Sequence, residues 1–166
     1  MPNSHFPLPI QAGISLGSNL GKSNFILRQA INQLQKLHTS RQNTFLISSF
    51  YKTNPINCPP DSPDFLNAVV QLETSLSSHE LMKFLQQMEA EAGRPLPRVK
   101  NAPRTLDLDL LYHGRATLAT DLLTLPHPRI LEREFVLRPL SEIAPSLILP
   151  GWKKTAKEYL LNSNNI

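Results

Sequence analysis

Two aspartates, Asp107 and Asp109, stand on either side of Leu108 in a run where charged and apolar residues alternate. This alternation is typical of a β-strand with one buried face. Residues two apart on a strand project to the same side, so we expect the two carboxylates to lie side by side. Such a pair suits Mg²⁺ that carries substrate phosphates. Because a bare Asp-x-Asp is not specific, a solvated strand face is the alternative.

Four basic residues precede the aspartates within a segment interrupted by prolines: Arg94, Arg98, Lys100 and Arg104. Guanidinium groups bind phosphate oxygens through paired hydrogen bonds. Carboxylates for a metal beside guanidinium groups for phosphate are the equipment of phosphoryl transfer, which is our central hypothesis. The basic side chains repel one another when no phosphate is present, so we expect the loop 93–103 to become ordered when a phosphate-bearing substrate and its metal bind.

Length and composition predict one folded domain spanning residues 1–166, with residues 1–10 as an extended arm. The net charge of +4 and pI of about 9.4 favour an anionic partner. The single cysteine, Cys58, excludes an intramolecular disulfide and a zinc site built from several cysteines. No segment approaches the ~18 apolar residues of a membrane span, and residues 1–9 do not resemble a signal peptide. We therefore expect a cytoplasmic protein.

The elements that must position the aspartates follow from hydrophobic periodicity. Strands are expected at 12–16, 44–51, 65–73 and 106–112, and amphipathic helices at about 25–37 and 78–92. The order strand, helix, strand, strand, helix, strand is the split βαβ, or ferredoxin-like, arrangement. It places both helices on one face of an antiparallel sheet, and the last third of the chain must then cover the other face. The expected fold is therefore α+β, a three-layer α/β/α sandwich.

The remaining segments are mostly irregular. Residues 17–19 are typical of a turn that caps the following helix, with a phosphate cradle as the alternative. Four prolines exclude a helix or central strand from 52–64, and a loop of this length is usually functional. His127 lies between two prolines, where a structural and a functional role are equally open.

After the aspartates, a short strand is expected at 116–118, a hydrophobic run at 135–137, a connection bounded by prolines at 139–150 and a helix at 155–161.

Seven short motifs occur together at a specific spacing: Leu16–Leu20, Ser48–Thr53, Asp64–Asn67, Gly93–Arg94, Pro103–Asp109, Pro126–His127 and Glu142–Pro145. On these motifs the chain resembles the 6-hydroxymethyl-7,8-dihydropterin pyrophosphokinase family of folate biosynthesis, from about Ile14 to Pro150. The resemblance implies that diphosphate passes from ATP to the pterin hydroxymethyl group, giving the pterin diphosphate and AMP. Attack would be on the β-phosphorus with the help of Mg²⁺.

The resemblance also implies roles for individual residues. Asp107 and Asp109 would hold two Mg²⁺ ions and act in catalysis together with Arg94 and Arg104. The ATP-binding residues would be Glu89, Arg94, Arg104, Leu110, Thr124, His127 and Arg133. The pterin-binding residues would be Thr53, Asn54, Pro55, Ile56, Phe65, Asn67 and Phe135. Phe65 and Phe135 would stack on either side of the ring; from the sequence alone, core packing is the alternative for both. ATP and the pterin would be the partners of a monomer that binds neither nucleic acid nor membrane.

This chain departs from some members of the family at three positions. Asn101 stands where those members have a tryptophan, and Leu96 and Leu122 stand where they have arginines. These differences bear on loop closure and nucleotide affinity. Two other functions remain as alternatives: an RNA-binding module on a ferredoxin-like fold, and a metal-dependent phosphate hydrolase that uses the same carboxylates. The expected strands lack the aromatic signature of RNA-binding sheets.

Overall fold

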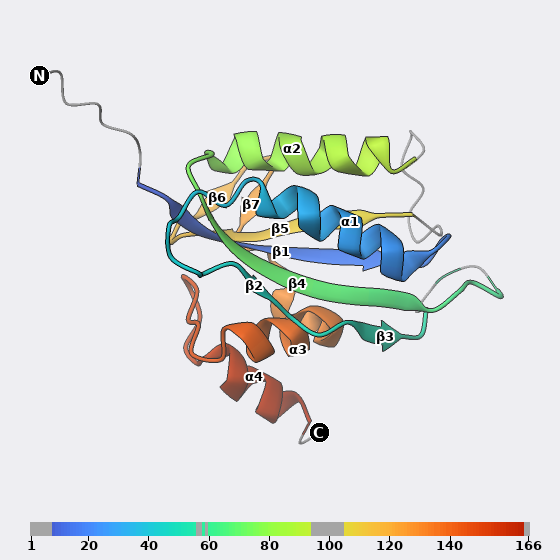
Figure 1. Cartoon of the computed structure of the whole chain (residues 1–166). Coiled ribbons are helices and arrows are strands. Elements are labelled where there is room, and N and C mark those ends of the chain that lie inside the picture. Colours follow the sequence, from blue (N-terminus) through green and yellow to red (C-terminus); the bar gives the residue numbers. More distant parts are fainter. Residues whose placement is uncertain (1–7, 56–57, 59, 94–104, 165–166) are drawn as a thin grey trace, which may run out of the picture.

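A single antiparallel sheet forms the centre of the computed structural model, which describes residues 8–55, 58, 60–93 and 105–164. Its strands are β1 (Ile10–Ser18), β2 (Leu46–Ile47), β3 (Tyr51–Thr53), β4 (Phe65–Thr74) and β5 (Asp107–His113). The strand order is β2-β4-β1-β5, with β3 also paired to β4 (Figure 1). The strand β5, which carries both aspartates, therefore lies at one edge of this sheet.

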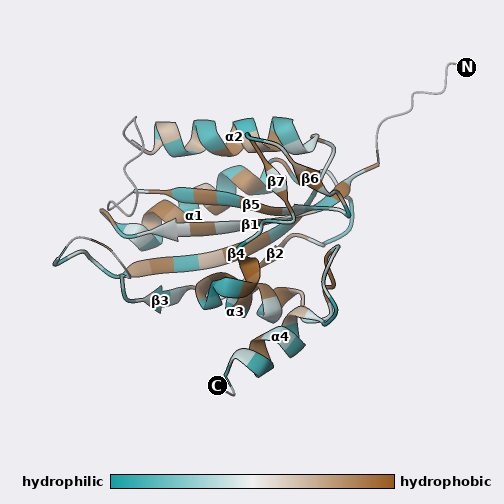
Figure 2. Cartoon of the chain, turned by 180° about the vertical axis from the view of Figure 1, so that it is seen from behind, coloured by the Kyte–Doolittle hydropathy of each residue, from teal (hydrophilic) through white to brown (hydrophobic). Residues whose placement is uncertain are grey.

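Helices α1 (Ser23–Gln35) and α2 (Ser78–Glu91) cover one face of the sheet, as the split βαβ order predicted (Figure 1). Both helices carry apolar and polar residues along their length (Figure 2). Leu34 of α1 and Leu81 of α2 are fully buried in the core that these helices form with the sheet. A capping box at Ser77 and Glu80 begins α2. Phe25 near the start of α1 has the spacing of the apolar face but does not belong to the core, since its side chain is 57% exposed.

The opposite face is covered by the C-terminal third of the chain, which confirms the three-layer α+β arrangement. It consists of the 3₁₀ helix η1 (Ile130–Glu132) and the helices α3 (Glu134–Ile143) and α4 (Ala156–Ser163) (Figure 1). The helix at 155–161 was predicted, and Thr155 caps it by accepting a hydrogen bond from the Glu158 amide.

Helix α3 departs from the sequence-based expectation, in which an irregular connection begins at Pro139. Proline lacks the N–H that would bond the carbonyl of Phe135 one turn earlier, and this absence normally disfavours a helix. Val136, Leu137 and Leu140 are all buried in the second hydrophobic core. Their burial at helical spacing outweighs the missing hydrogen bond.

The prediction of one continuous strand over residues 44–51 is also wrong, because this part of the chain forms two short strands, β2 and β3. Ile47 pairs with Val70 and Tyr51 with Asn67, so four steps along this strand match three steps along β4. The mismatch is a β-bulge, which leaves one residue without a partner in the ladder. Ser48 replaces part of the missing backbone pairing, because its side-chain oxygen accepts a hydrogen bond from the Val69 amide at 2.9 Å.

Two smaller expectations also needed correction. The strand expected at 116–118 is β6 (Leu118–Ala119), which pairs with β7 (Thr124–Leu125) in a separate hairpin. Residues 17–19 do not cap α1, whose N-cap is Lys22 without a side-chain hydrogen bond. Asn19 instead donates to the carbonyl of Pro63 at 3.2 Å, which ties the proline-rich loop to the end of β1.

Within the described residues no helix is long and apolar enough to span a bilayer.

Candidate active site

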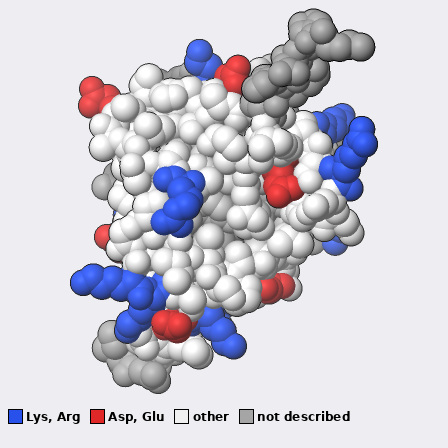
Figure 3. Space-filling model, turned by 90° about the vertical axis from the view of Figure 1, so that its left-hand side faces the viewer, with Lys and Arg blue, Asp and Glu red and all other residues white. Residues whose placement is uncertain are grey.

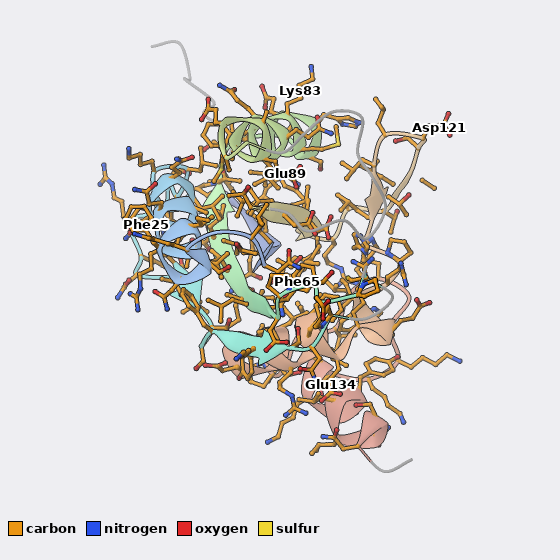
Figure 4. All side chains as sticks on the ribbon, turned by 90° about the vertical axis from the view of Figure 1, so that its right-hand side faces the viewer. Phe25, Phe65, Lys83, Glu89, Asp121 and Glu134 are labelled. Atoms are coloured by element: carbon orange, nitrogen blue, oxygen red, sulfur yellow. The ribbon has the colours of Figure 1, made fainter. Side chains whose placement is uncertain are left out.

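Polar side chains gather where β1 ends and where β4 and β5 begin. Gly17 pairs with Asn67 on one side and with Asp107 on the other. A Cβ atom placed on Gly17 would lie 3.4 Å from the Asn67 side-chain oxygen and 4.0 Å from both Phe65 and Asp107. These three side chains therefore border one space above the glycine. Figure 4 looks onto this end of the molecule, where Phe65 lies between the helical layers.

Asp107 and Asp109 lie on the same side of β5, opposite Gly17 and Ser15 of β1 respectively. Both carboxylates are half-buried. An oxygen of Asp109 lies 3.6 Å from a guanidinium nitrogen of Arg133, the residue that precedes α3. Half-exposed carboxylates that share one side of a strand fit Mg²⁺, which keeps several coordination positions for water and phosphate. Among the described residues, no group of three or more His, Cys, Asp or Glu could hold a metal ion.

The residues predicted to contact pterin come from three elements around this space. Asn67 is 5% exposed, and its side-chain amide donates to the hydroxyl of Thr53 at 2.8 Å. Phe65 is half-buried, whereas Phe135 is 36% exposed near the start of α3. The Arg133 guanidinium carbon lies 5.8 Å from the centre of the Phe135 ring, a cation–π contact. Asn54 and Pro55 directly follow β3, while Ile56 lies outside the described residues.

A cavity of about 300 Å³ runs beside the edge strand β5, between α2, the β6–β7 hairpin and the residues after it. Its lining includes four residues of the predicted ATP set: Glu89, Leu110, Thr124 and His127. Asp109 lines it as well. Arg133 lies next to the cavity through its contact with Asp109. Arg94 and Arg104 lie outside the described residues, as does most of the loop 93–103, so the expected ordering of that loop remains a prediction.

Glu89 has a structural role that the sequence did not suggest. It is 2% exposed and lies between α2 and the sheet (Figure 4). Its carboxylate accepts a hydrogen bond at 2.8 Å from the backbone N–H of Leu108, the residue between the two aspartates. Because a hydrogen bond is directional, Glu89 fixes the position of β5 from the side of α2.

A second bulge positions His127. Ile14 pairs with Leu110 and Gly13 with Tyr112, so Leu111 is the extra residue of β5. The carbonyl of Leu111 accepts the His127 backbone N–H at 2.8 Å, and the ring Nδ1 accepts the Arg129 amide at 3.2 Å. Burial lowers the pKa of His127; the negative charges of Asp109 and Asp107 oppose this, and the charges of Arg133 and Arg129 add to it. Because Nδ1 accepts, the neutral ring carries its proton on Nε2.

Sequence reasoning missed three cavity residues on α2: Met82, Leu85 and Gln86. Together with Glu89 they follow the spacing i, i+3, i+4, i+7, which places side chains on one face of a helix. This spacing was the signal that could have found them, once Glu89 was singled out.

An antiparallel α+β domain with a carboxylate pair beside a cavity and a cationic group is equipped as enzymes that transfer phosphate-containing groups are. Residues 13–145 match the family model described as 7,8-dihydro-6-hydroxymethylpterin-pyrophosphokinase (HPPK), and the chain belongs to this family. It is an enzyme of folate biosynthesis that transfers pyrophosphate.

Relatives of known identity support this assignment. The chain is 44% identical over 144 residues to the 2-amino-4-hydroxy-6-hydroxymethyldihydropteridine pyrophosphokinase of Haemophilus influenzae, covering 86% of each protein. It is 45% identical over 132 residues to the enzyme of the same name from Bacillus subtilis, covering 80% of this chain and 77% of the relative. A crystal structure of an HPPK-DHPS protein in complex with substrates has the same fold, with a TM-score of 0.73 at 14% identity. The match covers 95% of this chain and 44% of that longer one.

Proposed function

We propose that this enzyme transfers the diphosphate of ATP to 6-hydroxymethyl-7,8-dihydropterin, releasing AMP, and that it does so as a cytoplasmic monomer. The observation that carries the proposal is the position of Asp109. Asp109 lines the cavity along the outer edge of β5, and its carboxylate contacts Arg133 on the side of β5 that borders the space above Gly17. A nucleotide in the cavity and a second substrate in that space would therefore meet at the two aspartates.

The cavity suits ATP. Leu110 and Met82 supply apolar surface for the flat adenine, whereas Thr124 and the Nε2–H of His127 supply hydrogen-bond donors for polar groups of the nucleotide. The triphosphate would extend toward Asp109, where Arg133 contributes a positive charge. Arg94 and Arg104 remain predicted partners of the phosphates.

The space above Gly17 suits a pterin ring. The amide nitrogen of Asn67 is engaged by Thr53, which leaves the side-chain oxygen facing this space as an acceptor. Pterin carries N–H donors on its pyrimidine edge, so this acceptor can orient the ring. Phe65 and Phe135 would stack on its two faces, with Asn54, Pro55 and Ile56 closing the pocket.

Asp107 and Asp109 would hold two Mg²⁺ ions. A bound metal neutralises phosphate charge and orients the reacting oxygens. The pterin hydroxymethyl oxygen forms a bond to the β-phosphorus. The bond between the β-phosphorus and the oxygen that bridges it to the α-phosphorus breaks, and AMP leaves with that oxygen and the electron pair. The hydroxyl proton goes to solvent, since we assign no side chain as the general base. Arg133 stabilises negative charge on the transferred group.

The experiment that tests this function measures AMP formation by the purified enzyme. We expect AMP to appear only when ATP, Mg²⁺ and 6-hydroxymethyl-7,8-dihydropterin are all present. Release of phosphate or diphosphate at the same rate without the pterin would instead identify a phosphate hydrolase, and ADP as the product would identify an ordinary kinase.

A further inference from the structure

Two of the motifs that carry the family resemblance, residues 48–53 and residues 142–145, contain side chains to which the proposed chemistry assigns no role: Ser49, Tyr51 and Glu142. The structure brings them together. Glu142 lies in the last turn of α3, and its carboxylate accepts hydrogen bonds from Ser49 and Tyr51. These contacts join the edge of the sheet to the helix that covers it, across more than ninety residues of sequence.

The bulge between β2 and β3 leaves a backbone N–H without a partner on β4, and the carboxylate of Glu142 accepts a hydrogen bond from it. A bulge leaves a residue unpaired, and the backbone N–H of Ser49 points away from β4 to Glu142, at 2.9 and 3.1 Å from its two oxygens. The Ser49 hydroxyl donates to one of these oxygens at 2.7 Å, and the Tyr51 hydroxyl donates to the other at 2.6 Å. Both oxygens of Glu142 therefore receive charge-assisted bonds.

Both elements that this contact joins, β3 and α3, carry residues of the proposed pterin pocket. Tyr51 pairs with Asn67, and two residues further along β3 the Thr53 hydroxyl accepts the Asn67 amide. On the helix, Phe135 precedes Glu142 by seven residues, which is close to two full turns, so both lie on the same side of α3. Glu142 therefore connects the helix that carries Phe135 to the strand that orients Asn67.

We propose that Glu142 is a positioning residue of the pterin site, which sets the separation and register between Phe135 on α3 and the Thr53–Asn67 pair on the sheet. This inference rests on the proposed function, because it needs the pterin to bind between these elements. Apolar packing of α3 on the sheet is not directional and allows the helix to shift along its axis. Hydrogen bonds of fixed geometry at Glu142 remove that freedom.

The test compares Glu142→Gln and the milder Tyr51→Phe with a matched control, Glu73→Gln. Glu73 also lies on the sheet and accepts a short hydrogen bond, at 2.7 Å from the Thr44 hydroxyl, but near the opposite end of β4. We expect Glu142→Gln to raise KM for the pterin about tenfold while KM for ATP changes less than about twofold. Tyr51→Phe should have a smaller effect in the same direction. Glu73→Gln should change neither KM, even where it lowers the melting temperature equally.

A second measurement does not depend on turnover. Amide hydrogen exchange over residues 49–53 should accelerate in Glu142→Gln and stay unchanged in Glu73→Gln. Equal rises in both KM values, or an unchanged pterin KM in a folded Glu142→Gln variant of an active enzyme, would overturn the inference alone. A wild-type enzyme that makes no AMP with the pterin present would overturn the proposed function and, with it, this role for Glu142.

Discussion

Asp109 lies where the cavity along β5 and the space at the end of the sheet meet, and Asp107 lies two residues away on the same side of the strand. If both carboxylates hold Mg²⁺ against the triphosphate, neutralising either one removes charge that the transition state needs. We expect Asp107→Asn and Asp109→Asn each to lower turnover by a factor on the order of 10² or more at saturating Mg²⁺. Steady-state AMP formation measures this.

Glu158→Gln is the matched control, because it removes one negative charge from α4, the helix that packs against the second hydrophobic core. It should keep wild-type turnover. Near-wild-type activity of either aspartate variant at saturating Mg²⁺ would show that the metal assignment is wrong.

Phe135 and Phe25 form a natural pair for testing the ring pocket, since both are partly exposed phenylalanines on helices that cover opposite faces of the sheet. Phe135→Ala should weaken pterin binding by roughly 1–3 kcal/mol, the size of lost stacking and burial. ATP affinity should change much less. Phe25→Ala should leave both affinities unchanged. Isothermal titration with each ligand measures these values, and an equal loss for both ligands in Phe135→Ala would make Phe135 a packing residue.

At the residue scale, the sequence predicted the side-by-side placement of Asp107 and Asp109 because a strand period of two is a local property. It could not predict that Glu89 anchors β5. The partner of Glu89 is a backbone N–H on another element, and no pattern in the sequence marks such a group. For the same reason, the contact between Glu142 and Ser49 appears only in the folded chain.

At the scale of elements, α1, α2 and the long strands were predictable because each has a regular apolar face and clear boundaries. Helix α3 was missed because the local effect of Pro139 was weighed without the burial that tertiary packing provides. The division of 44–51 into β2 and β3 was missed because a bulge depends on the partner strand and on Glu142, which are both remote in sequence.

The contact between α3 and the β2–β3 edge should also make stability depend on pH. Burial raises the pKa of Glu142, but hydrogen bonds from Tyr51 and Ser49 outweigh it and hold the pKa below its usual value of 4.5. A carboxyl with a lowered pKa in the folded state stabilises the fold above its unfolded pKa, and this contribution is lost as the pH falls through the folded pKa. The stability difference between wild type and Glu142→Gln should therefore be largest above about pH 5 and shrink toward pH 3.

Urea unfolding of both proteins across this pH range measures the difference. A difference that stays constant with pH would show that the Glu142 hydrogen bonds do not depend on its ionisation.

At the scale of the whole molecule, the two helical layers leave the end and one edge of the sheet for the proposed substrates. The basic side chains on the face shown in Figure 3 are spread over several places with acidic side chains between them. A nucleic-acid-binding surface instead gathers lysine and arginine along one stripe. The charges on this face therefore form no such stripe, and it gives the RNA-binding alternative no support.

The central claim is that the β- and γ-phosphates of ATP pass together to the pterin. The most direct measurement uses ATP labelled in the γ-phosphate, with Mg²⁺ and 6-hydroxymethyl-7,8-dihydropterin, followed by separation of the products. We predict that the label appears in the pterin diphosphate, with one unlabelled AMP formed for each labelled pterin. Label in free phosphate, or a pterin monophosphate formed together with ADP, would contradict attack on the β-phosphorus and with it the proposed reaction.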